Sequence, residues 1–333
     1  MSRVIAFVLT YNRKDLLQQC LKAIMSQTRA CDEVIVVDNA STDGTSVMLQ
    51  ETWLDRVHVY TLSRNIGASG GFSAGFRLAY ARGADFVWVM DDDVIPAEDA
   101  LERLLAADRT LNAHGIKHAF VGSLPRTPEG ELTNIPDVYD KRNKVSYPRW
   151  PDMLDHKMVA VRRATFVSIL IPREVIRRHG LPMACMYIWG EDIEYTRRIT
   201  RDVPGYLVGD SRVVHVRAVS GPPRIATEVD PTRLRWHTYA VRNAMYTLRA
   251  HKGRGALARA VRTRLVQALH FALRGDLKRA KIITRGLLLG LSFRPVAEPA
   301  EAPLSTLNVT ATVIGPPDPD FSTSGEARDY EFG

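Results

Sequence analysis

Residues 86–93 read Phe-Val-Trp-Val-Met-Asp-Asp-Asp, an apolar run that ends in three carboxylates. A short apolar run of this kind is typical of a buried strand. Carboxylates crowded together resist ionising at the same time, and a divalent cation held by oxygen ligands removes that conflict. We therefore predict a metal site at the carboxyl end of a strand; the alternative is a solvated turn, because aspartate is common in turns.

Patterns typical of strands and helices alternate through the first third of the chain. The strand patterns are short apolar runs, and the helical patterns place apolar residues at three- and four-residue spacing. This alternation predicts an α/β fold built on a mostly parallel, doubly wound sheet. The expected strands cover residues 4–9, 33–37, 57–62 and 85–90, and the expected helices cover residues 15–25, 42–49 and 69–82.

The rest of the chain divides by composition. Within an expected sheet domain of residues 1–230, residues 125–160 mix prolines with aromatic residues, which predicts a long functional loop or a small subdomain, and residues 166–171 form another strand pattern. Residues 231–295 predict a basic amphipathic region of two or three helices. Residues 296–333, rich in Pro, Ala, Ser, Thr and acids, predict a disordered acidic tail.

Length and composition indicate a globular protein with a substantial core. The chain has 333 residues, of which 45% are hydrophobic and 25% charged. It contains no run of about 18 apolar residues and no recognisable leader, so neither a transmembrane helix nor a signal peptide is expected. Cys20, Cys31 and Cys185 lack the spacing of a zinc site and suggest reduced thiols in the cytoplasm.

The net charge of +8 is concentrated in one region. Residues 232–295 carry fifteen Lys or Arg against one acid, whereas the last 38 residues carry seven acids against one arginine. Basic surface serves nucleic acid, anionic membranes or anionic substrates, and charge alone does not choose among them. The apolar stretch 282–293 beside these basic residues favours a helix lying on an anionic membrane; the alternative is ordinary packing of amphipathic helices on the rest of the protein.

Polar side chains follow the first two expected strands where each strand ends. Residues 10–13 read Thr-Tyr-Asn-Arg, and residues 37–44 read Val-Asp-Asn-Ala-Ser-Thr-Asp-Gly. Carboxyl ends of parallel strands meet at one edge of a sheet, so both segments should lie near the three aspartates. Asp38 could accept the imide N–H of uracil, with Thr10 and Asn12 as further polar contacts; turn and helix-cap roles are the equal alternative.

A glycine-rich stretch opens the next expected helix. Residues 64–72 read Arg-Asn-Ile-Gly-Ala-Ser-Gly-Gly-Phe. Glycine lets the backbone approach a ligand and a helix N-terminus favours anions, but tight packing of the helix on the sheet explains these glycines equally well. The spacing of Gly67, Gly70 and Gly71 does not fit a dinucleotide-binding fingerprint.

Taken in order, these motifs and the Trp-Gly-Glu-Asp of residues 189–192 resemble a family 2 glycosyltransferase of GT-A fold. The resemblance covers residues 3–220. The glycine-rich segment, the triple aspartate and residues 189–195 are most similar to bacterial galactofuranosyltransferases, and rhamnosyltransferases share much of the pattern.

The resemblance implies a site for Mg²⁺ or Mn²⁺. Asp91 and Asp93 would hold the metal against the donor diphosphate, where it would neutralise the charge of the leaving group. In galactofuranosyltransferases a histidine after the catalytic carboxylate completes the metal shell, which implies this role for His215. A lone histidine among valines is otherwise a core residue.

The resemblance also implies catalytic and substrate-binding residues. Asp192 would be the general base that deprotonates the acceptor hydroxyl, with Glu191 as its adjacent alternative. Without the triple aspartate, an acidic first helical turn would explain both carboxylates. Asp92 would lie near the donor sugar or ribose and Asp38 near the base, while Trp189 would either wall the acceptor sugar or pack in the core. The other expected substrate contacts are Thr10, Asn12, Arg13, Asn65 and Gly67.

The implied activity is inverting, metal-dependent transfer of a sugar, with galactofuranose as the first choice, from a UDP-sugar to a hydroxyl of a glycan or polyprenyl-diphosphate-linked glycan in cell-envelope polysaccharide synthesis. Such an enzyme would be cytoplasmic and peripheral on the inner face of the cell membrane. A rhamnosyltransferase using a dTDP-sugar is the alternative within the family. The alternative outside it is a non-catalytic protein that binds nucleotide sugars or nucleic acid. No nucleic-acid motif accompanies the basic charge, so no nucleic-acid partner is expected.

Overall fold

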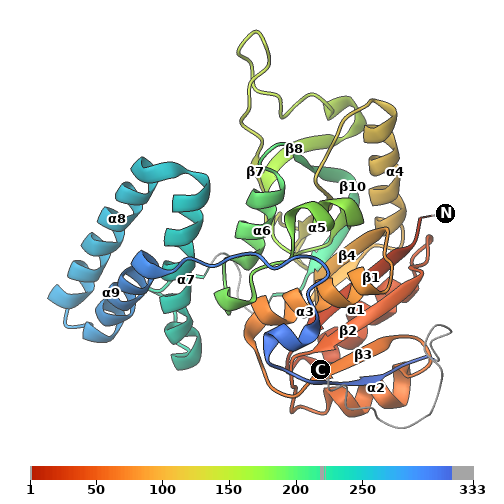
Figure 1. Cartoon of the computed structure of the whole chain (residues 1–333), viewed down its shortest axis with the longest axis horizontal. Coiled ribbons are helices and arrows are strands. Elements are labelled where there is room, and N and C mark those ends of the chain that lie inside the picture. The colour runs from red at the N-terminus through yellow and green to blue at the C-terminus, as the bar shows by residue number, and fades with distance from the viewer. Residues whose placement is uncertain (1, 218–220, 222, 317–333) are drawn as a thin grey trace.

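The chain folds around one broad sheet that carries helices on both faces, with a helical bundle beside it (Figure 1). This is the arrangement in a computed structural model, which describes residues 2–217, 221 and 223–316. The strands are β1 (Val4–Thr10), β2 (Glu33–Asp38), β3 (His58–Leu62), β4 (Phe86–Asp91), β5 (Val94–Pro96), β6 (Val121–Arg126), β7 (Asp137–Val138), β8 (Met158–Arg163), β9 (Ile169–Pro172), β10 (Gly205–His215) and β11 (Ala311–Ile314). The helices are α1 (Lys14–Met25), α2 (Thr45–Trp53), α3 (Gly67–Ala81), α4 (Ala100–Ala113), α5 (Arg173–His179), α6 (Glu191–Ile199), α7 (Pro231–His251), α8 (Gly253–Leu273) and α9 (Leu277–Ser292), with short 3₁₀ turns η1 (Leu154–His156), η2 (Ala184–Met186) and η3 (Leu304–Leu307).

The sheet has a parallel half and a mixed half. Strands β3, β2, β1 and β4 lie side by side in that order and run parallel, as the alternating pattern predicted. Beyond β4 the order continues β9, β6, β10, β8 and β7, and most of these pairings are antiparallel. The α/β class is therefore confirmed, but the expectation of a mostly parallel sheet holds only for its N-terminal half. Residues 127–168, all of them described, contain no α-helix that could make a parallel crossover.

Helices α7, α8 and α9 form a bundle with a core of its own. Two glycines let α9 lie against α7: a Cβ atom added at Gly286 would be 2.7 Å from Cβ of Val241, and one at Gly290 would be 2.8 Å from Cβ of Met245. These helices occupy the segment for which the sequence predicted two or three basic helices. The buried apolar residues of the bundle are Ile225, Leu234, Val241, Met245, Ala268, Ile282, Ile283 and Leu287.

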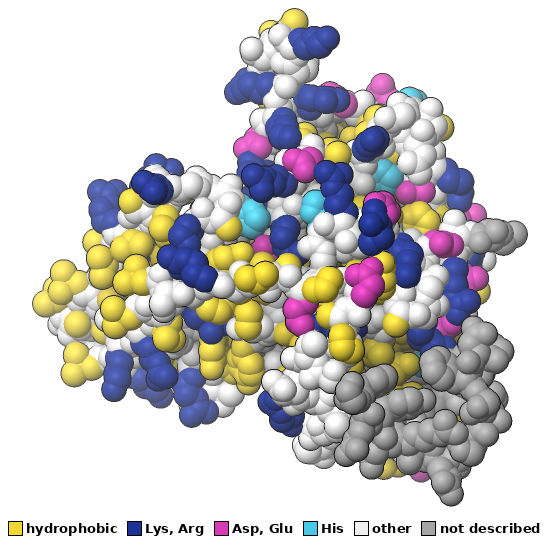
Figure 2. All heavy atoms as spheres, viewed as in Figure 1, with side chains coloured by type: hydrophobic (Ala, Val, Ile, Leu, Met, Phe, Trp, Pro, Cys, Tyr) yellow, Lys and Arg dark blue, Asp and Glu magenta, His cyan; other side chains and the backbone are white. Residues whose placement is uncertain are grey.

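The outer surface of this bundle is apolar along α8 and α9. Figure 2 shows hydrophobic side chains gathered there, with lysines and arginines at the margins. Within the described part of the chain, no helix is both long enough and apolar enough to cross a bilayer. The exposed large apolar residues of the two helices and their connection are Leu265, Val266, Leu269, Leu273, Leu277, Leu288, Leu289 and Leu291.

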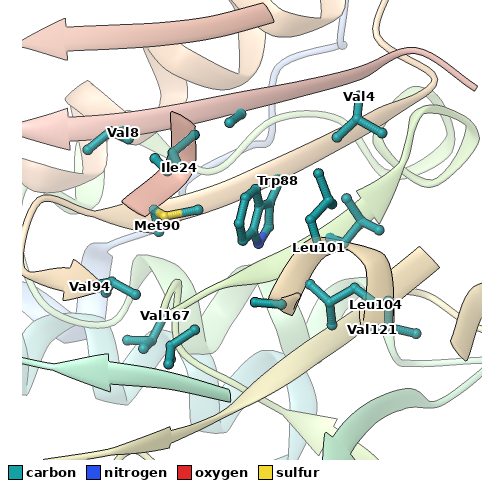
Figure 3. Close-up of a cluster of buried hydrophobic side chains, with 14 of the residues drawn as sticks. Val4, Val8, Ile24, Trp88, Met90, Val94, Leu101, Leu104, Val121 and Val167 are labelled. Carbon is teal, nitrogen blue, oxygen red and sulfur yellow. The ribbon is translucent and has the colours of Figure 1, made fainter. Parts of the chain in front are cut away.

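The parallel strands are buried on both faces. Even-numbered residues of segment 4–8 point to a layer containing α1, α2 and α4, and odd-numbered residues of segment 5–9 point to a layer containing α3, α5 and α6. Trp88 of β4 is fully buried in the first layer (Figure 3), and its Nε1 donates a 3.0 Å hydrogen bond to Oγ of Ser168. Burial on both faces explains why these strands are continuous apolar runs in the sequence.

Helix α3 lies very close to β1 because glycines face the strand. A Cβ atom at Gly75 would be 2.1 Å from the ring of Phe7, and one at Gly71 would be 2.3 Å from the side chain of Leu9. At Gly67, where φ is +77°, a Cβ atom would be 2.3 Å from the carbonyl oxygen of Tyr187. Packing therefore accounts for Gly67 and Gly71 of the glycine-rich stretch, and for Gly75 beyond it.

The segment after the bundle corrects a prediction. We expected disorder from residue 296, but η3 and β11 both lie beyond it, and β11 pairs antiparallel with the edge strand β3. Ala300 and Leu304 enter the core under α3, and Oε2 of Glu298 lies 2.5 Å from Nη2 of Arg77. Backbone pairing at a sheet edge needs few apolar residues, so composition concealed it. Residues 317–333 lie outside the described residues.

The glycine contact between α9 and α7 yields a matched pair of substitutions. In an ordinary helical position, Gly→Ala stabilises a helix by up to about 1 kcal/mol. We expect this gain for Gly255→Ala, because a Cβ atom there meets only the end of the Arg259 side chain at 3.7 Å. Gly286→Ala should instead lower the free energy of unfolding by roughly 1–3 kcal/mol through overpacking. Denaturant unfolding of both variants checks this; stabilisation by Gly286→Ala would show that the contact between α7 and α9 is loose.

Candidate active site

A cavity of about 970 Å³ lies between the carboxyl edge of the parallel strands and the helical bundle. Its sheet side is formed by the ends of β1, β4 and β10 and by the start of α6, and its other side by α7, α8 and α9. Among the described residues, five carboxylates line it: Asp91, Asp92, Asp93, Glu191 and Asp192.

The triple aspartate is tied to the end of β1 through Thr10 and Arg13. The hydroxyl of Thr10 donates a 2.8 Å hydrogen bond to Oδ2 of Asp92. Nη1 of Arg13 lies 3.1 Å from Oδ1 of Asp92 and 2.6 Å from Oδ2 of Asp93, so one guanidinium bridges two carboxylates. Burial works to lower the pKa of Arg13, but the aspartates outweigh it and raise that pKa, so the positive charge is held firmly.

The three aspartates differ in how easily they ionise. Burial, together with repulsion from Asp93 and Asp92, raises the pKa of Asp91 well above its usual value. Burial likewise raises the pKa of Asp92, to about 6, against the opposing charge of Arg13. Burial opposes ionisation of Asp93 too, but His215 and Arg13 outweigh it and hold the pKa of Asp93 below its usual value.

His215 lies against Asp93 at the end of β10. Its Nε2 is 3.1 Å from Oδ1 of Asp93, and its Nδ1 is 3.0 Å from Oδ1 of Asn134. The Asp93–His215 contact is at ion-pair distance, and the buried Oδ1 of Asp93 has no further partner among the described residues. His215 is thus a buried residue in contact with the acidic cluster, not a histidine packed only among valines.

The donor set around Asp93 suits a hard divalent cation. A buried carboxylate oxygen without a hydrogen-bond partner lies beside an imidazole nitrogen, and Asp91 lines the same cavity. In the part of the chain that the structure describes, no three His, Cys, Asp or Glu side chains are already close enough to hold a metal ion. Here Arg13 supplies the positive charge between Asp92 and Asp93. The residue types fit a cation whose remaining ligands come from substrate or water.

A second acidic pair begins helix α6. Glu191 is buried and accepts a 3.1 Å hydrogen bond from Oγ of Ser69, whereas Asp192 is only half-buried and its Oδ1 accepts from the backbone N–H of Ile193 at 2.7 Å. Burial and the neighbouring charge of Asp192 raise the pKa of Glu191 to about 8. Burial raises the pKa of Asp192 to about 6, partly offset by the backbone hydrogen bond and by Arg163.

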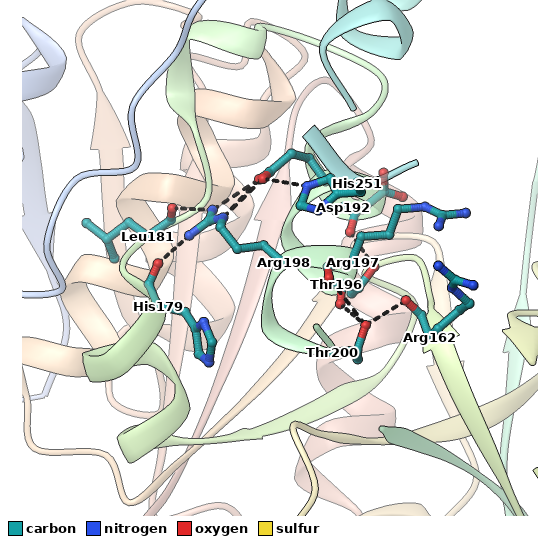
Figure 4. Close-up of polar contacts among 10 residues, drawn as sticks. Arg162, His179, Leu181, Asp192, Thr196, Arg197, Arg198, Thr200 and His251 are labelled. Atoms are coloured by element: carbon teal, nitrogen blue, oxygen red, sulfur yellow. Dashed lines mark hydrogen bonds and ion pairs between the residues drawn. The ribbon is translucent and has the colours of Figure 1, made fainter. Parts of the chain in front are cut away.

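Helix α6 is fixed on three sides (Figure 4). The hydroxyl of Thr200 donates to the carbonyl of Arg162 at the end of β8, at 2.7 Å. Nη2 of Arg198 donates to the carbonyl of Leu181 at 2.9 Å. Nε2 of His251, in the last turn of α7, lies 3.3 Å from Oε1 of Glu194. The acidic pair therefore starts a helix whose position is set by the sheet, the segment after α5 and the bundle.

The segment before α6 is held by one asparagine of α7. Nδ2 of the fully buried Asn243 lies within hydrogen-bond distance of the carbonyl oxygens of Met186 at 2.9 Å, Ile188 at 3.2 Å and Trp189 at 2.9 Å. This segment is strained, since Tyr187 and Trp189 have φ values of 66° and 59°. Sequence reasoning missed Asn243, whose only signal was a polar residue on the inner face of an amphipathic helix.

Trp189 lies between the sheet domain and the bundle. Its ring centroid is 5.7 Å from that of Trp236 and 4.9 Å from that of His237, and the guanidinium of Arg233 lies 5.5 Å from it. The residue lines the cavity while packing on α7, so the packing role is observed and the contact with an acceptor sugar stays a prediction.

The structure gathers most of the predicted site residues but leaves two outside the cavity lining. Asp38 is fully buried and accepts hydrogen bonds from the N–H of Ser41 at 2.9 Å and from Oγ of Ser46 at 3.2 Å. Oδ1 of Asn12 accepts from the N–H of Thr42 at 2.7 Å. Both side chains hold the turn after β2, which was the alternative to a contact with the base. The predicted residues that line the cavity are Thr10, Arg13, Asn65, Gly67, Asp91, Asp92, Asp93, Trp189, Glu191, Asp192 and His215.

Other lining residues were not predicted. Asn39 joins the end of β2 to the start of α3, since its Nδ2 donates to the carbonyl of Gly67 at 3.1 Å and its Oδ1 accepts from Ile66 at 3.0 Å. Arg163 brings a positive charge near Asp192 from the end of β8. Neither residue carried a distinguishing pattern, because a lone Asn in a turn and a lone Arg at a strand end are common.

Comparison with known proteins agrees with this arrangement. Residues 5–170 match the sequence family described as glycosyl transferase family 2. Galactofuranosyltransferase GlfT1 of Mycobacterium tuberculosis (strain H37Rv) is 31% identical over 207 residues, which cover 60% of this chain and 64% of that protein. GlfT1 of Mycolicibacterium smegmatis is 26% identical over 214 residues, covering 60% and 65%. The chain thus spans a little under two thirds of the length of these two relatives.

Solved structures support the same fold. GalNAc-T7, crystallised with UDP, GalNAc and Mn²⁺, aligns with a TM-score of 0.52 at 17% identity over 74% of this chain and 51% of that one. Residues 1–349 of TarS from S. aureus align with a TM-score of 0.50 at 14% identity, covering 88% and 93%. With the fold and the family match over residues 5–170 in agreement, the chain belongs to family 2 of the glycosyltransferases.

Proposed function

We propose that the protein transfers a sugar, with inversion, from a nucleotide diphosphate donor to the hydroxyl of a glycan acceptor. The observation that carries this proposal is the presence of two separate acidic groups on one cavity, the aspartates after β4 and the pair that starts α6. One group suits a cation and a diphosphate, and the other suits a hydroxyl that must lose its proton. Direct displacement needs these two functions and no covalent nucleophile.

Asp192 is the general base in this proposal. Burial raises the pKa of both carboxyls, but the backbone N–H of Ile193 and the charge of Arg163 favour the ionised form of Asp192. The charge of Asp192 instead disfavours ionisation of Glu191. Environments that push two carboxyl pKa values apart are typical of acid–base sites. Asp192 is also the more exposed of the two, while Glu191 is held by Ser69.

Asp91, Asp93 and His215 would hold Mg²⁺ or Mn²⁺. The ion would supply positive charge to the leaving diphosphate. Arg13, which spans Asp92 and Asp93, supplies a second positive charge on the same side and keeps Asp92 oriented through contacts shared with Thr10. Support for a metal also comes from the Mn²⁺ and UDP named for the GalNAc-T7 structure.

The first-choice donor is UDP-galactofuranose, and the acceptor is a glycan carried on a polyprenyl diphosphate in cell-envelope synthesis. The 31% identity with a galactofuranosyltransferase supports the sugar. Exposed apolar side chains of α8 and α9, flanked by basic ones, support a peripheral position on the inner face of the membrane.

The decisive experiment incubates the protein with UDP-galactofuranose, dTDP-rhamnose, UDP-galactose or UDP-glucose, Mn²⁺ and a glycan acceptor. The product's anomeric configuration is read by NMR. Transfer with retention, or no transfer from any donor, would refute the proposal.

The first functional prediction concerns the base. Asp192→Asn should keep donor binding but reduce transfer at least about a hundredfold, the scale of a general base. In the wild type, activity should rise with pH through about 6, because the base must be deprotonated, and this limb should vanish in the variant. Glu191→Gln is the matched control and should keep the limb. Near-normal turnover by Asp192→Asn would move the base elsewhere.

The second prediction concerns the metal. Asp93→Ala and His215→Ala should both weaken binding of Mn²⁺ with UDP, because each removes one side of the buried pair in the cavity. The measurement is the increase in Tm that saturating UDP and Mn²⁺ produce, which for wild type at 100 times Kd corresponds to about 2.7 kcal/mol. A His215→Ala variant that loses basal Tm but keeps the full ligand-induced increase would assign His215 to the core alone.

The third prediction concerns the membrane. Replacing Leu265, Leu269 and Leu273 with serine should release the protein from anionic vesicles, since these side chains are exposed on α8. Attraction to the basic margin, on the order of 1 kcal/mol per residue near the lipid, should weaken as salt increases. Co-sedimentation across a salt series measures both effects, and UDP binding by the triple variant is the control for folding. Failure of the wild-type protein to bind anionic vesicles at low salt would contradict the membrane position.

A further inference from the structure

The bundle side of the cavity carries polar groups that the proposed transfer reaction does not use. His237 of α7 is only 6% exposed, and its Nε2 has no hydrogen-bond partner among the described residues although the residue lines the cavity. Burial lowers its pKa, as do the positive charges of Arg264 and Arg233, although Glu228 opposes them. A neutral imidazole with a free nitrogen therefore lies beside Trp189, at a ring distance of 4.9 Å.

Arg264 of α8 lines the same part of the cavity and lacks a counter-charge. Its Nη1 donates to Oε1 of Gln267 at 2.7 Å, and no ion pair joins it to a carboxylate in the described ranges. Burial lowers its pKa, and no nearby carboxylate counteracts this. The neighbouring arginines differ: Arg233 lies 3.1 Å from Glu228, and Arg279 lies 2.7 Å from Asp276. A half-buried guanidinium without a carboxylate is ready to bind an anion.

The apolar surface of α8 begins one residue after Arg264. Leu265, Val266 and Leu269 are between 52% and 63% exposed, and Leu273 is 80% exposed. An anion bound at Arg264 would therefore lie where the cavity meets an apolar surface. A ligand with a polar head group, an anionic linking group and a hydrocarbon chain matches the order of cavity, Arg264 and apolar face of α8.

We propose that Arg264 and His237 form a subsite for the diphosphate of a lipid-linked acceptor, whose hydrocarbon chain runs along the exposed apolar face of α8. The assignment rests on the proposed transfer reaction, because it names the group by which the acceptor is held. Arg264 supplies charge-assisted hydrogen bonds to the diphosphate, and Nε2 of His237 supplies a further one from the bundle side. Trp189 contacts the ring of His237 at this subsite, and Trp236 contacts Trp189; both tryptophans line the cavity.

The donor diphosphate is a different anion at a different place. In the proposed reaction it would lie on the sheet side, near Arg13 and the aspartates that would hold a cation. The two diphosphates would then approach the sugar from opposite walls of one cavity, and the bundle would act as the acceptor wall.

Farnesyl diphosphate is the probe that tests the subsite, and quenching of tryptophan fluorescence is the readout, because Trp189 and Trp236 border it. Titrations are run on the full chain in saturating UDP and Mn²⁺, so that the donor site is filled. Arg264→Gln should raise the Kd for farnesyl diphosphate roughly tenfold or more, the scale of a charge-assisted hydrogen bond. Arg262→Gln is the matched control, since Arg262 is exposed on the same helix and does not line the cavity, and it should change Kd less than about twofold.

Further ligands separate the sources of binding. Farnesol and inorganic diphosphate should each bind at least about tenfold more weakly than farnesyl diphosphate. The His237→Ala substitution should weaken the binding of farnesyl diphosphate without lowering the Tm of the protein. The subsite is refuted if UDP with Mn²⁺ displaces farnesyl diphosphate, or if Arg264→Gln and Arg262→Gln behave alike. If inorganic diphosphate binds as tightly as farnesyl diphosphate, the proposed contact between the hydrocarbon chain and the apolar face of α8 is refuted. Binding of UDP with Mn²⁺ is measured on the same samples, so its absence would refute the proposed function separately from the subsite.

Discussion

Repulsion among the carboxylates around one cavity is the constraint on which the rest of the structure depends. The aspartates after β4 and the pair at the start of α6 open onto the same space, and each is at least partly shielded from water. Arg13 and His215 offset part of this repulsion on the sheet side. What remains raises the pKa of Asp91 and Glu191, beyond the cost of burial itself, and keeps the cavity ready for positive charge.

Such an arrangement survives only if the backbone around it is rigid, and the helical bundle provides part of that rigidity. Asn243 fixes three carbonyl groups of the segment before α6, and His251 contacts Glu194 in the first turn of that helix. The bundle is therefore part of the site and not an appendage. Glycines at the contact between α9 and α7 matter for the same reason, since they let the bundle pack closely while α7 reaches the sheet domain.

Local sequence patterns predicted the fold class well, but they did not predict the contacts between segments distant in the chain. Strands buried on both faces are visible as apolar runs, and the three aspartates mark a strand end, so the α/β class and the edge that holds the site were accessible. The antiparallel half of the sheet was not, because strand direction depends on pairings between distant segments such as β4 with β9. The strand β11 was missed because its stability comes from pairing with β3, which leaves little trace in composition. Asp38 shows the same limit at the site: a polar residue at a strand end suits a ligand or a turn. Its bonds to Ser41 and Ser46 show the turn role, and the contact with the base stays a prediction.

The distribution of charge across the cavity links the site to the surface of the molecule. Carboxylates dominate the sheet side, whereas the bundle side presents Arg264 and Arg233, and the outer surface of the same bundle is apolar with a basic margin. The arginines that line the cavity and those at the edge of the outer apolar surface thus belong to the same bundle. The first are half-buried in the cavity, and the second face solvent. A basic margin attracts any anionic surface at long range and weakly, while a guanidinium inside the cavity binds one anion at close range. Under the proposed function, a single bundle would therefore bring the protein to an anionic surface and orient one amphiphilic molecule from that surface toward Asp192.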